Sequence, residues 1–208
     1  MKSLIEGYRR FRAGAWPNYR TLYERLASRG QAPRAMVIAC ADSRVDPQMI
    51  FDASPGELFV ARNVANLVPP YERDAAYHGT SAAVEFAVRV LEVRDLVVMG
   101  HGLCGGVRAL LEGTPDAASD FVAHWVDMAR PARERAIATG QTGEELQRIC
   151  EHECVKLSLA NLMSFPWIAE RVAAGKLTLH GCWFAVANGR LMLLDQDGRF
   201  APPEESGR

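Results

Sequence analysis

Short apolar runs that alternate with amphipathic stretches indicate an α/β protein. Residues 35–40 (AMVIAC) and 95–100 (DLVVMG) show little alternation of polar and apolar positions, which is typical of strands buried on both faces. A third such run lies near residues 58–61. Residues 79–91 repeat apolar side chains along one face of a helix. Because strands and helices alternate, we expect a mostly parallel central sheet of about four strands, flanked by helices.

The two ends of the chain show other patterns. Residues 1–30 have the spacing of one or two amphipathic helices, interrupted at Trp16-Pro17. Near the C-terminus, two strand-like runs flank Asn188-Gly189, a dipeptide that supplies the positive φ angles of a tight turn. This hairpin predicts an antiparallel strand at the C-terminal side of the sheet.

The chain is expected to form one domain. Residues 116–138 and 143–163 have the pattern of two longer helices. No repeat, low-complexity segment or flexible linker divides the sequence, so we expect a single domain over residues 1–208. Within it, residues 1–30 would form an N-terminal helical arm and residues 31–200 the α/β core.

Charge and composition exclude several classes of function. The 208 residues carry 24 basic and 25 acidic side chains, a formal net charge of −1, and no basic stripe for nucleic acid. No apolar run approaches the roughly 18 residues of a membrane span, and the N-terminus lacks the apolar region of a secretory signal. We therefore expect a cytoplasmic protein that binds neither nucleic acid nor membranes. Its five cysteines are an odd number, which in a reducing compartment favours metal binding or catalysis over disulfides.

Three potential metal ligands follow two of the expected strands. Cys40 ends the first apolar run, and His101 and Cys104 lie in the glycine-rich turn GHGLCGG after the third. Ligands bind outside the carboxyl ends of parallel strands, so we expect these residues to meet. Two thiolates and an imidazole suit zinc, and three protein ligands leave a fourth position for chemistry. Without Cys40, the His-x-x-Cys pair would equally fit a buried thiol beside a turn histidine.

Asp42 and Arg44 follow Cys40 at alternate positions and would face the same side of an extended chain. A carboxylate beside a zinc-bound water can orient that water, and an arginine can hold the carboxylate away from the metal. If Asp42 bound the zinc directly as a fourth ligand, the site would be closed. Without a metal, the same two residues would form a salt bridge at a strand end.

Four segments together resemble the β-class carbonic anhydrases, in particular the plant-like subgroup. They are CADSR, GELFVARNVANLV, GHGLCGG and SLANLMSFPWI, and the resemblance extends from about Gln31 to Asp195. It implies a zinc lyase that hydrates CO2 reversibly to bicarbonate by attack of zinc-bound hydroxide. It also implies one zinc per chain, bound by Cys40, His101 and Cys104, with Asp42 and Arg44 as the catalytic dyad.

The resemblance also implies a substrate pocket and an assembly. The residues that match pocket positions of the family are Gln31, Val45, Phe59 and Phe86, with the backbone N–H groups of Gly105 and Gly106 placed to bind an anion. From their spacing alone, the two phenylalanines would be interpreted as ordinary core residues. The family pairs its subunits, so the resemblance implies a homodimer or homotetramer in which the N-terminal helices of one subunit pack on the other and the pocket lies near the interface.

The sequence departs from the family pattern at three positions. Gly102 stands where serine is common, and Ala185 stands where aspartate is common. Val37 replaces the tryptophan that lines an inhibitory bicarbonate pocket in the allosteric subgroup, which argues against strong bicarbonate inhibition by that route. This substitution leaves Arg62 free for another partner, such as a group across a subunit interface.

The segment CEHEC suggests a second metal site less strongly. Cys150 and Cys154 lie four residues apart on one face of the expected helix, and His152 points elsewhere. The simpler interpretation is two core-facing thiols, with Glu151, His152 and Glu153 facing outward.

Other functions remain as alternatives. Hydrolysis of CS2 or COS on the same scaffold would require a narrow tunnel, for which the sequence carries no insertion. A zinc-binding regulatory domain without catalysis would be favoured by loss of Asp42 or Arg44, but both are present. A dinucleotide-binding domain fits less well, because GHGLCGG lacks the G-x-G-x-x-G pattern.

Tyr77 and His78 are weak candidates for a proton shuttle.

Overall fold

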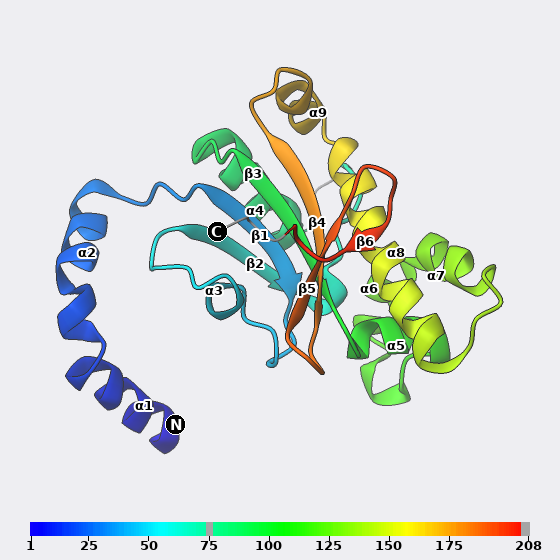
Figure 1. Ribbon diagram of the computed structural model, residues 1–208, viewed down its shortest axis with the longest axis horizontal. Helices are drawn as coiled ribbons and strands as arrows, with labels where there is room; N and C mark the ends of the chain where they lie inside the picture. Colours follow the sequence, from blue (N-terminus) through cyan, green and yellow to red (C-terminus); the bar gives the residue numbers. More distant parts are fainter. Residues whose placement is uncertain (74–76, 205–208) are drawn as a thin grey trace.

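A six-stranded sheet forms the centre of the structure, which is a computed structural model and describes residues 1–73 and 77–204 (Figure 1). The strands are β1 (Ala35–Cys40), β2 (Leu58–Asn63), β3 (Asp95–His101), β4 (Thr178–Ala185), β5 (Arg190–Leu194) and β6 (Phe200–Ala201). Their order across the sheet is β2-β1-β3-β4-β5-β6. The first four are parallel, and β5 runs antiparallel to its two neighbours, β4 and β6. This confirms the expected mostly parallel sheet and adds the short strand β6.

Helices flank this sheet and extend beyond it. The longer ones are α1 (Lys2–Ala13), α2 (Trp16–Arg29), α5 (Gly105–Glu112), α7 (Arg130–Ile137), α8 (Gly143–Met163) and α9 (Pro166–Ala173). Shorter turns of helix are α3 (Pro47–Ile50), η1 (Val64–Asn66), α4 (Gly79–Glu85), the π-helical η2 (Phe86–Val90), η3 (Asp116–Ala118) and α6 (Val122–Asp127).

Alternate residues of the central strands point to opposite faces of the sheet, as the period of two requires. On one face, Met36 and Ile38 of β1 and Leu96 and Val98 of β3 are fully buried. They share a cluster with apolar side chains of α4, η2, α8 and α9. These helices therefore cover that face and exclude water from it, which accounts for the unbroken apolar runs in the sequence.

The parallel register brings the ends of β1 and β3 together. Ala39 of β1 pairs with Met99 of β3, so Cys40 and His101 lie at the same edge of the sheet. Cys104 then precedes the first turn of α5. The expected meeting of these three residues at the carboxyl ends of neighbouring strands is confirmed.

Two expected helices differ in detail. The segment 116–138 is not one helix but η3, α6 and α7, with Pro131 in the first turn of α7. Proline lacks a backbone N–H and restricts the residue before it, so it starts a helix more readily than it continues one. The segment 79–91 begins as α4 and continues as the wider η2. In contrast, α8 spans residues 143–163 as expected.

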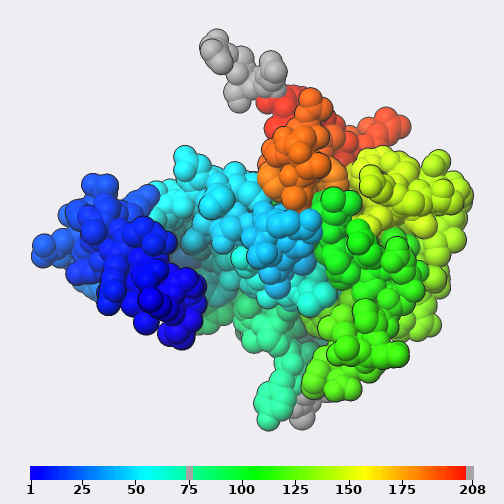
Figure 2. All heavy atoms as spheres, turned by 90° about the horizontal axis from the view of Figure 1, so that it is seen from below, coloured from blue at the N-terminus to red at the C-terminus, as the bar shows by residue number. Residues whose placement is uncertain are grey.

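Helices α1 and α2 form an arm that projects to one side of the sheet (Figures 1 and 2). None of their residues is buried. Leu4 and Tyr8 of α1 are among the large apolar side chains left exposed, at 70% and 60%. Among the described residues, no helix is long and apolar enough to cross a membrane.

Candidate metal centre

The side chains of Cys40, His101 and Cys104 converge at the edge of the sheet. Their ligand atoms all lie within 4.8 Å of one another, and all three residues are buried. The two sulfur atoms are 3.9 Å apart. Two sulfurs at about 2.3 Å from one tetrahedral zinc would lie about 3.8 Å apart, so this spacing fits that ion.

The imidazole of His101 is oriented for metal binding. Its Nδ1–H donates to the carbonyl oxygen of Gly102 at 2.9 Å. This bond leaves the lone pair on Nε2, the arrangement that metal-binding histidines use. Nε2 is buried and has no hydrogen-bond partner in the described part of the chain. An orphaned acceptor beside two thiols is the observation that a metal ion best explains.

The two thiols influence each other's protonation. A hydrogen bond from the Cys104 thiol lowers the pKa of Cys40, and the same contact raises the pKa of Cys104. The pair therefore holds one proton and one thiolate readily, since two adjacent thiolates would repel each other. A cation between the sulfurs would remove that repulsion, because metal ions bind the thiolate form.

Asp42 and Arg44 form a bidentate ion pair beside these ligands. Arg44 Nε lies 2.9 Å from Asp42 Oδ1, and Nη2 lies 2.7 Å from Oδ2. The arginine holds the pKa of Asp42 well below its usual range. Asp42 Oδ2 lies 4.0 Å from His101 Nε2, so the carboxylate borders the space that the ligand atoms enclose.

Arg62 has other partners, as expected, and those that the structure shows lie in the same chain: the guanidinium binds the backbone that carries this dyad. It donates to the carbonyl oxygens of Cys40, Asp42 and Val45 at 2.9, 2.6 and 2.9 Å. Asp46 lies 3.5 Å from the same guanidinium. The loop after β1 is thus fixed by a charged side chain from β2.

Glu151 contradicts the expectation that it faces outward. It is 2% exposed, and its Oε1 accepts the backbone N–H of Cys104 at 2.9 Å. Gln147 Nε2 donates to the same oxygen at 3.0 Å, and Trp183 Nε1 donates to Oε2 at 3.0 Å. Burial raises the pKa of Glu151, and these three donors oppose that shift.

The spacing of residues along α8 was one indication that Glu151 is buried. Gln147, Glu151, Ser158 and Leu162 are buried at helical spacing, so polar residues continue the apolar stripe of the helix. A stripe that includes an acid predicts a buried partner for it. The nature of that partner was not visible in the sequence.

The residues expected to line the substrate pocket fall into two groups. Val45 is buried in the same cluster as Cys40 and Cys104, and Gly105 and Gly106 begin α5 directly after Cys104. A Cβ on Gly106 would lie 2.7 Å from a methyl group of Val64, so this close approach requires glycine.

Gln31, Phe59 and Phe86 lie away from the ligands of the same chain. Phe59 pairs with Met36, four positions before Cys40, which corresponds to about 13 Å along the strand. Phe59 stacks on Phe86 with ring centroids 5.8 Å apart. Gln31 is exposed and precedes β1.

The other sequence candidates do not join the centre. Cys150 and Cys154 are fully buried thiols, and His152 stacks on Phe200 with ring centroids 4.0 Å apart. Among the described residues, these side chains form no second metal-binding group. Tyr77 is fully exposed.

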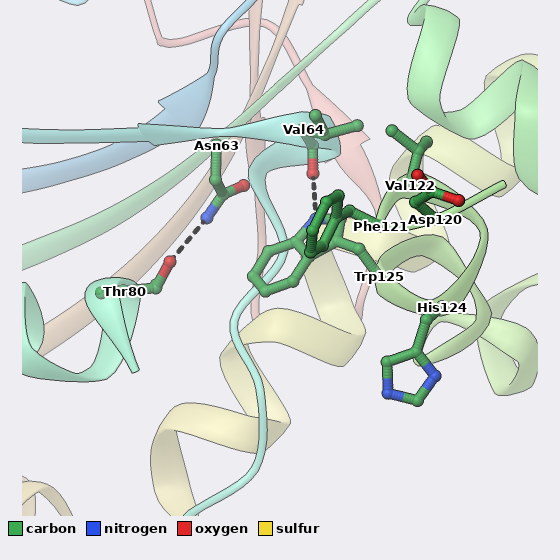
Figure 3. A pocket seen from close by; sticks show the side chains of 9 residues that line it. Asn63, Val64, Thr80, Asp120, Phe121, Val122, His124 and Trp125 are labelled. Atoms are coloured by element: carbon green, nitrogen blue, oxygen red, sulfur yellow. Dashed lines mark hydrogen bonds between the residues drawn. The ribbon is translucent and has the colours of Figure 1, made fainter. Parts of the chain in front are cut away.

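A cavity of about 520 Å³ lies at the end of β2 (Figure 3). Phe121 and Trp125 line it from one side, and Asn63 and Thr80 from the other. Trp125 Nε1 donates to the carbonyl oxygen of Val64 at 2.8 Å and closes one wall. None of the three potential metal ligands lines this cavity. The candidate site is therefore identified by the convergence of ligand atoms, and this cavity is not part of it.

Comparisons with known proteins agree with this geometry. Residues 35–191 match the family model described as carbonic anhydrase. The carbonic anhydrase of Pseudomonas aeruginosa is 39% identical over 201 residues, which cover 96% of this chain and 90% of that protein.

Solved structures extend the likeness to the fold. The β-carbonic anhydrase CcaA matches with a TM-score of 0.92 and 35% identity, covering 99% of this chain and 93% of that one. A tetrameric β-carbonic anhydrase from Sordaria macrospora matches with a TM-score of 0.74 and 31% identity, covering 91% of this chain and 96% of that one.

Proposed function

The chain belongs to the β-carbonic anhydrase family, and we propose that it hydrates CO2 reversibly to bicarbonate and a proton at the centre formed by Cys40, His101 and Cys104. Members of this family are zinc lyases. The observation that carries the proposal is the convergence of three ligand atoms within 4.8 Å beside an ion-paired carboxylate.

One zinc ion per chain would be held by the two thiolates and by His101 Nε2. Soft sulfur ligands and an imidazole are the donor set that zinc favours. When bound, zinc acidifies a water molecule and so supplies the nucleophile that CO2 requires near neutral pH. Three protein ligands leave the fourth position open for this purpose.

Asp42 is proposed to accept a hydrogen bond from the nucleophile and so to orient it. Its low pKa keeps it ionised, and therefore an acceptor, over the whole working pH range. Arg44 engages both carboxylate oxygens and holds Asp42 away from the metal. A closed form with Asp42 as fourth ligand would require this bidentate pair to break.

The substrate side of the pocket is proposed to come from both subunits of a homodimer, which could pair further into a tetramer. Val45, Gly105 and Gly106 are close to the ligands of their own chain. Gln31, Phe59 and Phe86 are too distant to contact a CO2 molecule at that site, so they would serve the centre of the partner. The exposed apolar side chains of α1 supply a surface for such pairing.

Stopped-flow CO2 hydration, with zinc content measured on the same sample, tests the proposal. We expect one zinc per chain and fast hydration, both lost in Cys104→Ala. Cys150→Ala is the matched control, because it also removes a buried thiol but should retain zinc and activity. Bound zinc without hydration would refute the CO2 assignment and direct the assay to CS2 and COS.

A further inference from the structure

Glu151 is a buried acid for which the proposed reaction has no direct use. Its three hydrogen-bond partners are all donors: the Cys104 N–H, Gln147 Nε2 and Trp183 Nε1. Both oxygens therefore act as acceptors, which is the arrangement of an ionised carboxylate. Burying such a group is unfavourable unless it is fully hydrogen-bonded. Among the described residues, the one backbone group that hydrogen-bonds to Glu151 is the N–H of Cys104, a potential metal ligand.

The contact of Glu151 fixes one end of a single peptide group. The N–H of Cys104 points to Glu151, and the carbonyl oxygen of Leu103, in the same peptide, accepts from Arg44 Nη2 at 3.0 Å. Leu103 has a φ of 57°, in the left-handed region that a non-glycine residue adopts only when its surroundings hold it there. The orientation of this peptide determines where Cβ and Sγ of Cys104 point.

The orientation of Glu151 depends in turn on Trp183. The indole covers Gly102, where an added Cβ would lie 3.1 Å from Trp183 Cζ2. Glycine at this position lets the ring approach, and the approach lets Nε1 reach the carboxylate.

We propose that Glu151 is a positioning residue that holds Cys104 in its metal-binding orientation, with Trp183 and Gln147 keeping the carboxylate in place. The inference rests on the proposed zinc site. Glu151 does not touch substrate or zinc; it acts through the backbone of a ligand. Hydrogen-bonded groups of this kind, one shell outside a metal, typically change its affinity by about 10- to 100-fold when they are altered.

Glu151→Gln is the central variant, because it preserves the shape of the side chain. Its amide has one acceptor and one donor end, so either the Cys104 N–H or the Trp183 N–H must lose its partner. We expect zinc release to a chromophoric chelator to accelerate about 10- to 100-fold. The visible spectrum of the cobalt-substituted protein should also change, because it reports the geometry of the thiolates. Glu153→Gln is the matched control, since Glu153 lies on the same helix but pairs with Arg135 and Lys156.

The double variant Glu151→Gln/Trp183→Phe distinguishes a positioning role of Glu151 from a general contribution to packing. Without the indole N–H, the amide nitrogen can face the ring while its oxygen accepts from Cys104. We therefore expect zinc release to be slower in the double variant than in Glu151→Gln alone. A general structural role predicts the reverse, because removing the indole as well would disturb the packing of this region further.

Three outcomes would overturn the inference. They are a folded Glu151→Gln protein with wild-type zinc release and cobalt spectrum, a double variant that releases zinc faster than Glu151→Gln, and a Glu153→Gln protein with the same defect. If Glu151→Gln does not fold, Trp183→Phe decides: its zinc release should rise several-fold, and an unchanged rate would refute the proposal. A wild-type protein without zinc would refute the proposed function together with this inference.

Discussion

Arg44 and Glu151 bind opposite ends of one peptide group, the one that joins Leu103 to Cys104. The arginine donates to its carbonyl oxygen at 3.0 Å, and the carboxylate accepts its N–H at 2.9 Å. The same arginine pairs with Asp42, so the carboxylate of the proposed dyad and the backbone of a proposed metal ligand share one partner. Displacing Arg44 would therefore disturb both the dyad and the orientation of Cys104.

A similar arrangement holds the other cysteine ligand. Arg62 donates to the carbonyl oxygen of Cys40 and to two further carbonyls in the loop after β1. Charged side chains thus fix the backbone of both cysteine ligands from outside the centre. Because hydrogen bonds to charged groups are stronger than neutral ones, these contacts hold the backbone of Cys40 and Cys104 firmly.

Asp42→Asn is expected to lower kcat/KM for CO2 hydration by about 100-fold or more, while zinc content stays unchanged. The asparagine amide has a single acceptor oxygen beside a donor NH2, so it loses the bidentate contact with Arg44 and the charge that orients the nucleophile. Stopped-flow hydration over a range of pH measures the effect. Asp127→Asn is the control, since Asp127 has the same two-atom contact with Arg130 on the exposed surface. A variant within twofold of the wild type would exclude Asp42 from catalysis.

Arg62→Met is expected to lower the free energy of unfolding by about 2–3 kcal/mol, because three carbonyl oxygens lose a charged donor. Urea denaturation of the zinc-loaded protein measures the change. Arg130→Met removes an exposed ion pair and should change stability by less than about 1 kcal/mol. Equal effects of the two substitutions would show that Arg62 does not support the loop after β1.

His152 is expected to contribute to acid sensitivity. Burial, followed by the nearby charges of Arg148 and Lys156, lowers its pKa to about 4, from an ordinary value of 6.5. The folded state thus favours neutral imidazole, and the unfolded chain takes up a proton first as the pH falls. Stability is complete above about pH 6.5 and declines between there and about pH 4, by at most about 3 kcal/mol.

Denaturation of His152→Phe at several pH values measures this contribution. The phenylalanine keeps an aromatic ring against Phe200 but cannot take up a proton. The variant should lose less stability than the wild type between neutral and mildly acidic pH. His124→Gln, which alters an exposed histidine, should follow the wild type. Parallel curves for wild type and His152→Phe would contradict the expectation.

The strands, and the convergence of Cys40, His101 and Cys104 at their ends, could be predicted from the sequence because the signals for the strands are local. The runs at residues 35–40 and 95–100 need only burial on both faces, and the order of elements places their carboxyl ends together. The expected single helix over residues 116–138 was wrong, because Pro131 starts a new helix there. Local pattern therefore predicts which elements form and where their ends meet.

Glu151 could not be assigned in this way, because two of its three hydrogen-bond donors are remote in the sequence. Cys104, directly before α5, is 47 positions away, and Trp183, in β4, is 32 positions away. An acid between two cysteines of a helix is normally exposed, since an unpaired buried carboxylate is so unfavourable. Only the packing of α8 against β4 shows that donors meet it there.

Subunit mixing tests whether Gln31 acts across the subunit interface. A chain with Cys104→Ala lacks a metal centre but retains Gln31, and a chain with Gln31→Ala retains the metal centre. In a heterodimer of the two, the intact centre receives Gln31 from its partner if that residue acts in trans. The activity of the co-expressed chains should therefore exceed the summed activities of the separate homodimers. If Gln31 acts within its own chain, neither site of the heterodimer is complete, and no gain is expected. Leu4→Glu/Tyr8→Glu, which places charge on the exposed face of α1, should weaken dimers in light scattering and abolish the gain. A co-expressed sample without any gain, although heterodimers are present, would assign Gln31 to its own chain or to no role.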